Sequence, residues 1–282
     1  MSALVTTHQA PRSVDLFEGL RSFRAHEPRL FDLGALLLIA MLPTAFAALV
    51  DPRTFLGINI WDKPLKFEFA LVVFLMTLVL FARFIPAATR EKRRYRVYVT
   101  AVCLAIIAEM VWIAAASALG TASHFNLTPI GRAIYSAMGA FAIFFTTVTA
   151  VFAWHIHRNP ATGLSPVVKD GIVVGLALVL PLTLVTAGTM ASMEGHWIGG
   201  ARTDAGGLAL IGWARDGGDL RVAHFFATHA MHFIPVFGLV SAQLAGADNK
   251  TPVRIFSGVF AAFVAYTFVE ALMGRPFLPF LG

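Results

Sequence analysis

The sequence predicts an all-α fold, a bundle of seven transmembrane helices, on three observations. Of the 282 residues, 57% are hydrophobic and only 13% are charged, whereas a soluble domain of this length carries about 25% charged residues. The mean hydropathy is +0.73. Apolar runs of roughly 20 residues, long enough to cross a hydrocarbon core of ~30 Å as a helix, recur along the chain. These properties indicate an integral membrane protein that crosses the bilayer several times.

Seven apolar segments are long enough to be membrane spans, and together they predict one membrane domain over residues 31–273. The segments cover residues 31–50, 64–84, 97–118, 133–154, 171–190, 222–244 and 255–273. The preceding residues 1–30 are polar and contain the stretch VDLFEGLRSF, in which Val14, Phe17, Leu20 and Phe23 recur at helical spacing. This stretch is expected to form either a short interfacial helix or a disordered leader.

Basic residues predict the orientation of the spans. The connection RFIPAATREKRRYR at 83–96 carries six Arg and Lys side chains, and such connections stay on the cytoplasmic side of a membrane. The N-terminus is then cytoplasmic, whereas the long loop at 191–221 and the tail at 274–282 are periplasmic. The net charge of +6 is explained by basic residues that anchor loops at a lipid surface, so a lipid bilayer is the expected partner and no nucleic acid is.

Three distinctive motifs fall on the expected outer side. They are WDKPLKF at 61–67, SHFN at 123–126 with TP at 128–129, and GDLRVAHFF at 218–226 with His229 following. Together they resemble a widespread family of uncharacterised bacterial multi-pass membrane proteins, over about two thirds of the chain. The resemblance implies a protein of the bacterial inner membrane and implies no particular activity.

The sixth span carries three histidines in RVAHFFATHAMHFIPVFG. His224, His229 and His232 fall at about 0°, 140° and 80° around a helix and therefore on one face. Glu109 in the third span is expected at a similar depth. Because neutral imidazole is the commonest metal ligand in proteins, these four residues are candidate ligands of a transition metal, which could be zinc, iron or copper.

A b-type haem is an alternative cofactor. It needs one or two axial histidines, and His224 with His124 or His196 could supply them. In an enzyme, Glu109 or Glu68 would be the general base, and a lipid or small molecule would reach the site from the outer leaflet.

Three classes of function remain open at this point. The first is a metal- or haem-dependent enzyme or redox protein that faces the periplasm, and the second is a proton-coupled or small-solute transporter. The third is a structural or assembly protein in which the histidines only hydrogen-bond between helices. The sequence leaves the oligomeric state and the substrate undetermined.

Three further expectations concern the outer side. Lys63 is expected to extend its amine to the membrane surface as an anchor, and Asp219 to cap the start of the sixth span. The glycine-rich loop before that span contains the apolar segment LALIGW at 208–213, which is expected to form a lid at the membrane interface or an ordered cap.

Overall fold

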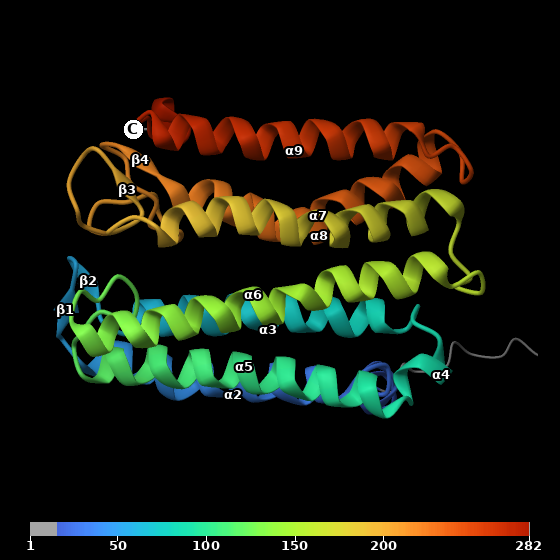
Figure 1. Cartoon of the computed structure of the whole chain (residues 1–282), viewed down its shortest axis with the longest axis horizontal. Coiled ribbons are helices and arrows are strands. Elements are labelled where there is room, and N and C mark those ends of the chain that lie inside the picture. The colour runs from blue at the N-terminus through green and yellow to red at the C-terminus, as the bar shows by residue number, and fades with distance from the viewer. Residues whose placement is uncertain (1–15, 282) are drawn as a thin grey trace, which may run out of the picture.

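The computed structural model describes residues 16–281 and consists mainly of long helices (Figure 1). Within this part of the chain, seven helices are long and apolar enough to cross a membrane, which confirms the predicted all-α bundle of seven spans. They are α2 (Pro28–Val50), α3 (Asp62–Ala82), α5 (Arg93–Ala118), α6 (Pro129–Arg158), α7 (Pro166–Ala191), α8 (Leu220–Leu244) and α9 (Thr251–Leu272).

Short elements join these spans. They are the helices α1 (Leu16–Arg24) and α4 (Ala87–Arg90), a final 3-10 helix at Pro279–Leu281, and two small antiparallel sheets. In one sheet β1 (Thr54–Phe55) pairs with β2 (Ile58–Asn59), and in the other β3 (Trp197–Ile198) pairs with β4 (Gly218–Asp219). The helix expected in VDLFEGLRSF corresponds to α1, with Phe17 and Leu20 exposed. Val14 lies outside the described residues, and the position of α1 relative to a membrane stays a prediction.

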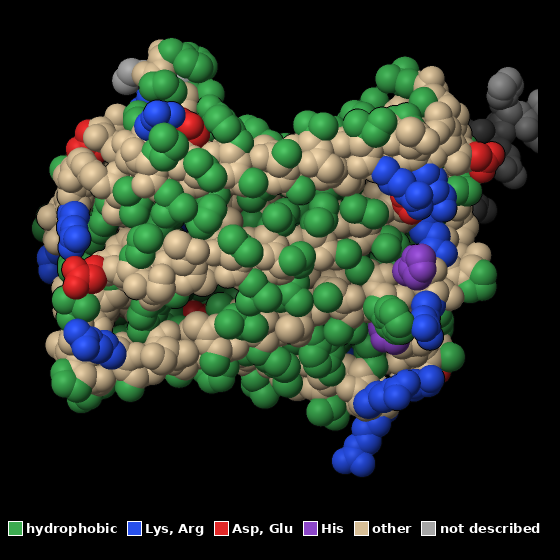
Figure 2. Space-filling view, turned by 45° about the horizontal axis from the view of Figure 1, so that its top comes forward, with side chains coloured by type: hydrophobic (Ala, Val, Ile, Leu, Met, Phe, Trp, Pro, Cys, Tyr) green, Lys and Arg blue, Asp and Glu red, His purple; other side chains and the backbone are tan. Residues whose placement is uncertain are grey.

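The two ends of the bundle differ in character. All four strands lie at one end, on the left in Figure 1, and we call this the hairpin end; it is formed by residues 51–61, 119–128, 192–219 and 273–281. The opposite end, which we call the basic end, is formed by residues 83–92, 159–165 and 245–250. Figure 2 shows Lys, Arg and His side chains gathered at the basic end and apolar side chains across the middle. Which end faces the cytoplasm stays a prediction.

In Figure 1 the spans appear as two groups, one of α2, α3, α5 and α6 and the other of α7, α8 and α9, although α6 packs more extensively against α7 than against α5. The second group is held together by a very close approach of α7 to α8. A Cβ atom on Gly175 would lie 2.9 Å from the carbonyl oxygen of Ala230 and 2.9 Å from Cδ of Pro235, and one on Gly171 would lie 3.5 Å from Cα of Gly238. Small residues allow this kind of backbone contact between membrane helices, and α6 joins the two groups by packing against α7.

Candidate site at the hairpin end

Residues 192–219, which we call the lid, cover the hairpin end and contact both groups of helices. On one side, strands β3 and β4 pair, and the amide of Leu220 at the start of α8 donates to the carbonyl of His196 at 2.9 Å. On the other side, the amide of Asp204 and Oγ1 of Thr203 both donate to the carbonyl of Leu56, each at 2.8 Å. Leu56 lies in the turn between β1 and β2, so the lid links α2 and α3 with α8.

The apolar segment LALIGW of the lid is divided between two environments. Leu210 is 96% exposed, whereas Trp213 is buried. The indole of Trp213 packs edge-on against the rings of Phe225 and Phe277, with each pair of centroids 5.5 Å apart. Trp213 therefore anchors the lid on α8, and entry of Leu210 into a membrane interface stays a prediction.

Four charged or polar side chains form a network under the lid. Asp219 caps α8 as predicted, because its Oδ1 accepts the backbone amide of Arg221 at 3.0 Å. Its Oδ2 accepts Nη2 of Arg221 at 2.7 Å, and its Oδ1 lies 3.2 Å from Nδ1 of His196. Asp204 completes the network, with Oδ1 at 2.8 Å from Nη1 of Arg221 and 3.5 Å from Nε2 of His196.

The charges of this network follow from its contacts. Burial raises the pKa of Asp219, but the adjacent His196 and the hydrogen bonds from Arg221 outweigh burial and hold the pKa well below its usual range. Burial lowers the pKa of His196 by more than the two neighbouring carboxylates raise it, so His196 is neutral near pH 7. Asp219 and Arg221 are therefore a charged pair that fixes the lid to α8.

Lys63 and His124 meet at the hairpin end of α3, and Glu109, deeper in α5, interacts with Lys63 through its charge. Nζ of Lys63 lies 3.2 Å from Nδ1 of His124, which also lies 3.1 Å from Oγ of Ser123. Burial lowers the pKa of His124 and the charge of Lys63 lowers it further, so the imidazole is neutral. Because an ammonium group can only donate, Nδ1 of His124 accepts the hydrogen bond from Lys63. The charges of Asp204 and Glu109 also act on Lys63.

Glu109 is the buried carboxylate of this cluster. It is 6% exposed, and its Oε1 has no hydrogen-bond partner. It lies nine residues before the end of α5, which corresponds to a depth of roughly 13 Å. Glu109 and Lys63 interact through their charges, but within the described residues they form no direct ion pair. Buried opposite charges are normally paired directly, whereas here Oε1 of Glu109 is left as an acceptor without a partner.

The expectation that Lys63 is a surface anchor is wrong. Its Nζ lies 3.2 Å from Nδ1 of His124, and the charge of Asp204 in the lid also acts on it. The motif WDKPLKF contains no signal for this inward orientation, since both partners are distant in the sequence.

The three histidines of α8 have different surroundings. Nδ1 of His229 lies 2.8 Å from the carbonyl oxygen of Phe225, and its ring stacks on the Phe225 ring at 4.0 Å. Nε2 of His232 lies 3.0 Å from Oγ1 of Thr77 on α3. The rings of His229 and His232 are 5.0 Å apart, and Nδ1 of His224 is buried without a partner. These contacts fit the alternative in which the histidines pack and hydrogen-bond between helices.

The predicted metal ligands are not gathered around one point. Among residues 16–281, no group of three or more His, Cys, Asp or Glu side chains is placed to hold a metal ion. Glu109 interacts with Lys63, and the candidate haem ligands have separate neighbours, since His124 contacts Lys63 and His196 contacts Asp219. Binding of a metal or haem by these residues stays a prediction.

Glu68, the second candidate base, lies between α2 and α3. Its Oε1 accepts a hydrogen bond from Oγ1 of Thr44 at 2.9 Å, and its Oε2 is buried without a partner. Its role stays a prediction, and no hydrogen bond or ion pair within the described residues links it to Lys63 or Glu109.

The fold and this cluster define a seven-span integral membrane protein with buried charges beneath a lid at one end. Comparison of the chain with protein-family models, with curated proteins and with solved structures found no match. Membership of a bacterial membrane family therefore stays a prediction from the short motifs. The structure brings these motifs together, because Lys63 of WDKPLKF contacts His124 of SHFN and interacts electrostatically with Arg221 of GDLRVAHFF.

Proposed function

We propose that this protein is a membrane-embedded enzyme that abstracts a proton from a lipid-soluble substrate, with Glu109 as the general base. One observation carries the proposal: Lys63 and Glu109 share a buried cluster without a direct ion pair. Ionisable groups inside a membrane protein normally mark a functional site. A polar group of a substrate placed near both side chains would supply the hydrogen-bond partner that Oε1 of Glu109 lacks.

The two side chains suit the two halves of a proton abstraction. Oε1 of Glu109 has no hydrogen-bond partner and can accept a proton from a C–H, O–H or N–H group. The ammonium group of Lys63 is held by His124 and can stabilise the negative charge that the substrate gains when the proton leaves. The proton returns from Glu109 to the product, so the enzyme is regenerated.

The position of the cluster supports a substrate that arrives from the bilayer. Glu109 lies roughly 13 Å from the end of its helix, and the lid covers the aqueous end of the site. The side of the bundle in Figure 2 is hollowed toward the hairpin end. A lipid-soluble molecule can therefore approach laterally, whereas the lid limits access from water.

The other predicted functions have less support. Metal or haem chemistry needs free histidine ligands, and two of the three histidines on α8 already have hydrogen-bond partners. A transporter needs polar groups along the whole path, and the buried ionisable groups named above lie toward the hairpin end. On the motif resemblance and the distribution of basic residues, we further place the protein in a bacterial inner membrane with its hairpin end toward the periplasm.

Lipid analysis after reconstitution tests the proposed function. The wild type and each variant are incubated in liposomes of a total bacterial lipid extract, including quinones, and the lipids are measured by mass spectrometry. We expect a lipid species to be converted by the wild type and by Glu270→Gln, but not by Glu109→Gln or Lys63→Met. Glu270 is a matched control because it is a half-buried carboxylate outside the cluster, bonded to Arg275 at 3.1 Å. No conversion by the wild type, or conversion that persists in Glu109→Gln, would refute the proposal.

A further inference from the structure

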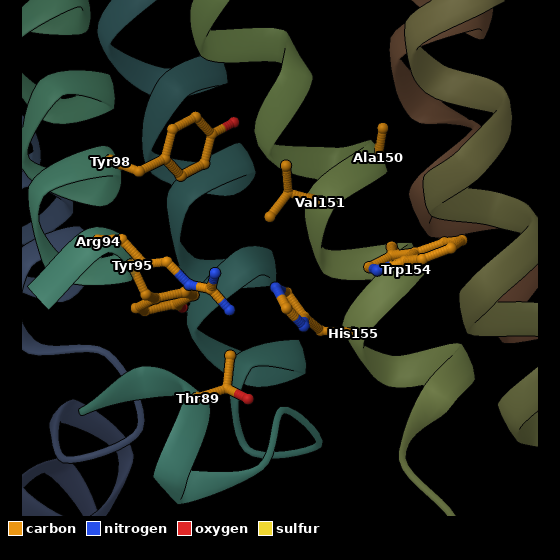
Figure 3. A pocket seen from close by; sticks show the side chains of 8 residues that line it. All are labelled: Thr89, Arg94, Tyr95, Tyr98, Ala150, Val151, Trp154 and His155. Atoms are coloured by element: carbon orange, nitrogen blue, oxygen red, sulfur yellow. The ribbon is translucent and has the colours of Figure 1, made fainter. Parts of the chain in front are cut away.

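A second site lies at the opposite end of the bundle. A pocket of about 500 Å³ opens at the basic end between α5 and α6 (Figure 3), and its walls include Arg94, Tyr98, Val151, Trp154 and His155. None of these residues belongs to the cluster around Lys63 and Glu109.

The polarity of the pocket changes with depth. Arg94 is the second residue of α5 and His155 lies three residues before the end of α6, so both lie within ~5 Å of the helix ends. Tyr98, Val151 and Ala150 line the deeper part, which reaches roughly 12 Å into the spans. A phospholipid in a bilayer has the same order, with a polar headgroup at the surface and an acyl chain below it.

The polar part of the pocket is basic. Figure 3 shows the side chains of Arg94 and His155 reaching toward one another from α5 and α6, and the charges of Arg94 and Lys92 act on His155. The guanidinium of Arg158 stacks on the ring of Trp154 at 4.0 Å. Within residues 16–281, no carboxylate forms an ion pair with Arg94 or Arg158 at the mouth of the pocket.

We propose that this pocket binds an anionic phospholipid. Its phosphate contacts the guanidinium of Arg94, which offers paired donors matched to phosphate oxygens, and an acyl chain lies along Tyr98 and Val151. Trp154 lies at the level where aromatic side chains meet lipid headgroups. Basic pockets between membrane helices recognise anionic headgroups in this way, and a zwitterionic lipid gains less because it carries no net charge.

Native mass spectrometry tests the proposal on the full-length protein in detergent. The protein is exposed to equal amounts of phosphatidylglycerol and phosphatidylcholine, and the retained lipid is measured. We expect the wild type to prefer phosphatidylglycerol, and Arg94→Gln to retain about tenfold less of it, because one charged hydrogen-bonding contact is lost. Arg96→Gln is the matched control: Arg96 is exposed on the same helix but does not line the pocket, so this variant keeps the wild-type preference.

A second variant separates lipid binding from folding. Val151→Trp fills the apolar part of the pocket without removing a charge, and it is also expected to reduce retention of phosphatidylglycerol. Equal retention of both lipids by the wild type, or equal losses in Arg94→Gln and Arg96→Gln, would overturn the proposal. Displacement of the lipid by millimolar inorganic phosphate would overturn it as well, because the acyl chain contacts should make the lipid the stronger ligand.

Discussion

Gly175 on α7 is a position where one added methyl group would directly oppose the packing of α7 against α8. The new Cβ would lie 2.9 Å from the carbonyl oxygen of Ala230 and 2.9 Å from Cδ of Pro235, whereas non-bonded atoms are most stable at about 3.5–4.0 Å. Neither neighbour can rotate away, because one is helix backbone and the other is a closed ring. We therefore expect Gly175→Ala to lose about 1–3 kcal/mol of unfolding free energy through this overpacking.

Gly188→Ala separates the cost of overpacking from the higher helix propensity of alanine. Gly188 lies on the same helix, and its Cβ would meet no atom within 4 Å, so this variant gains only the propensity term of about 1 kcal/mol. The difference between the two variants then reports the contact alone. Reversible unfolding in mixed micelles with rising dodecyl sulfate, followed by circular dichroism, measures both. If Gly175→Ala is as stable as Gly188→Ala, α7 and α8 do not approach as closely as described.

Three further substitutions test the contact between α3 and α8 and the interactions that attach the lid to α8. Thr77→Val removes the partner that lies 3.0 Å from Nε2 of the half-buried His232. The unfolding free energy should therefore fall by about 1–3 kcal/mol in the same micelle assay, and an unchanged value would contradict the bond. Trp213→Ala removes a buried anchor, and hydrogen exchange of the lid amides should rise by at least about tenfold while that of α5 stays constant. If exchange in the lid stays slow, the lid is held elsewhere. Burial raises the pKa of Asp219, but hydrogen bonds lower it further, so the folded pKa lies below the unfolded one. Its stabilisation of the lid is thus fully present above the unfolded pKa of about 4 and is lost as the pH falls below that value. Hydrogen exchange of the lid amides, corrected for its intrinsic pH dependence, should show this loss of protection in the wild type. The lid of Asp219→Asn should be less protected at every pH and should show no such change near pH 4. A wild-type lid that stays protected well below pH 4 would contradict the stabilising role of the Asp219 carboxylate.

The spans could be predicted because a membrane helix is specified by apolar length, a property of each segment alone. Their ends could not be placed from hydropathy, because the helices continue into polar surroundings. The fourth span illustrates this: the apolar run predicts residues 133–154, whereas α6 covers Pro129–Arg158. At its start, Oγ1 of Thr128 accepts the amide of Gly131, and at its end Arg158 stacks on Trp154.

The candidate site was predictable only where its interactions are local. Asp219 caps the helix that begins at the next residue, so its role follows from neighbouring positions. The inward orientation of Lys63 depends on His124, Asp204 and Glu109, which come from three other parts of the chain. The placement of the histidines on one face of a helix likewise did not indicate that His232 would bond to a threonine on α3.

The order of the cluster along the chain has a consequence for biosynthesis. Lys63, Glu109 and His124 are all translated before α6, whereas Asp204 and Arg221 follow only after α7. During insertion the ribosome therefore delivers the membrane-embedded charges before the residues of the lid exist. The ammonium of Lys63 meets the charges of Asp204 and Arg221 only when the beginning of α8 has emerged, so maturation of the hairpin end is coupled to synthesis of the chain through α7 and the lid.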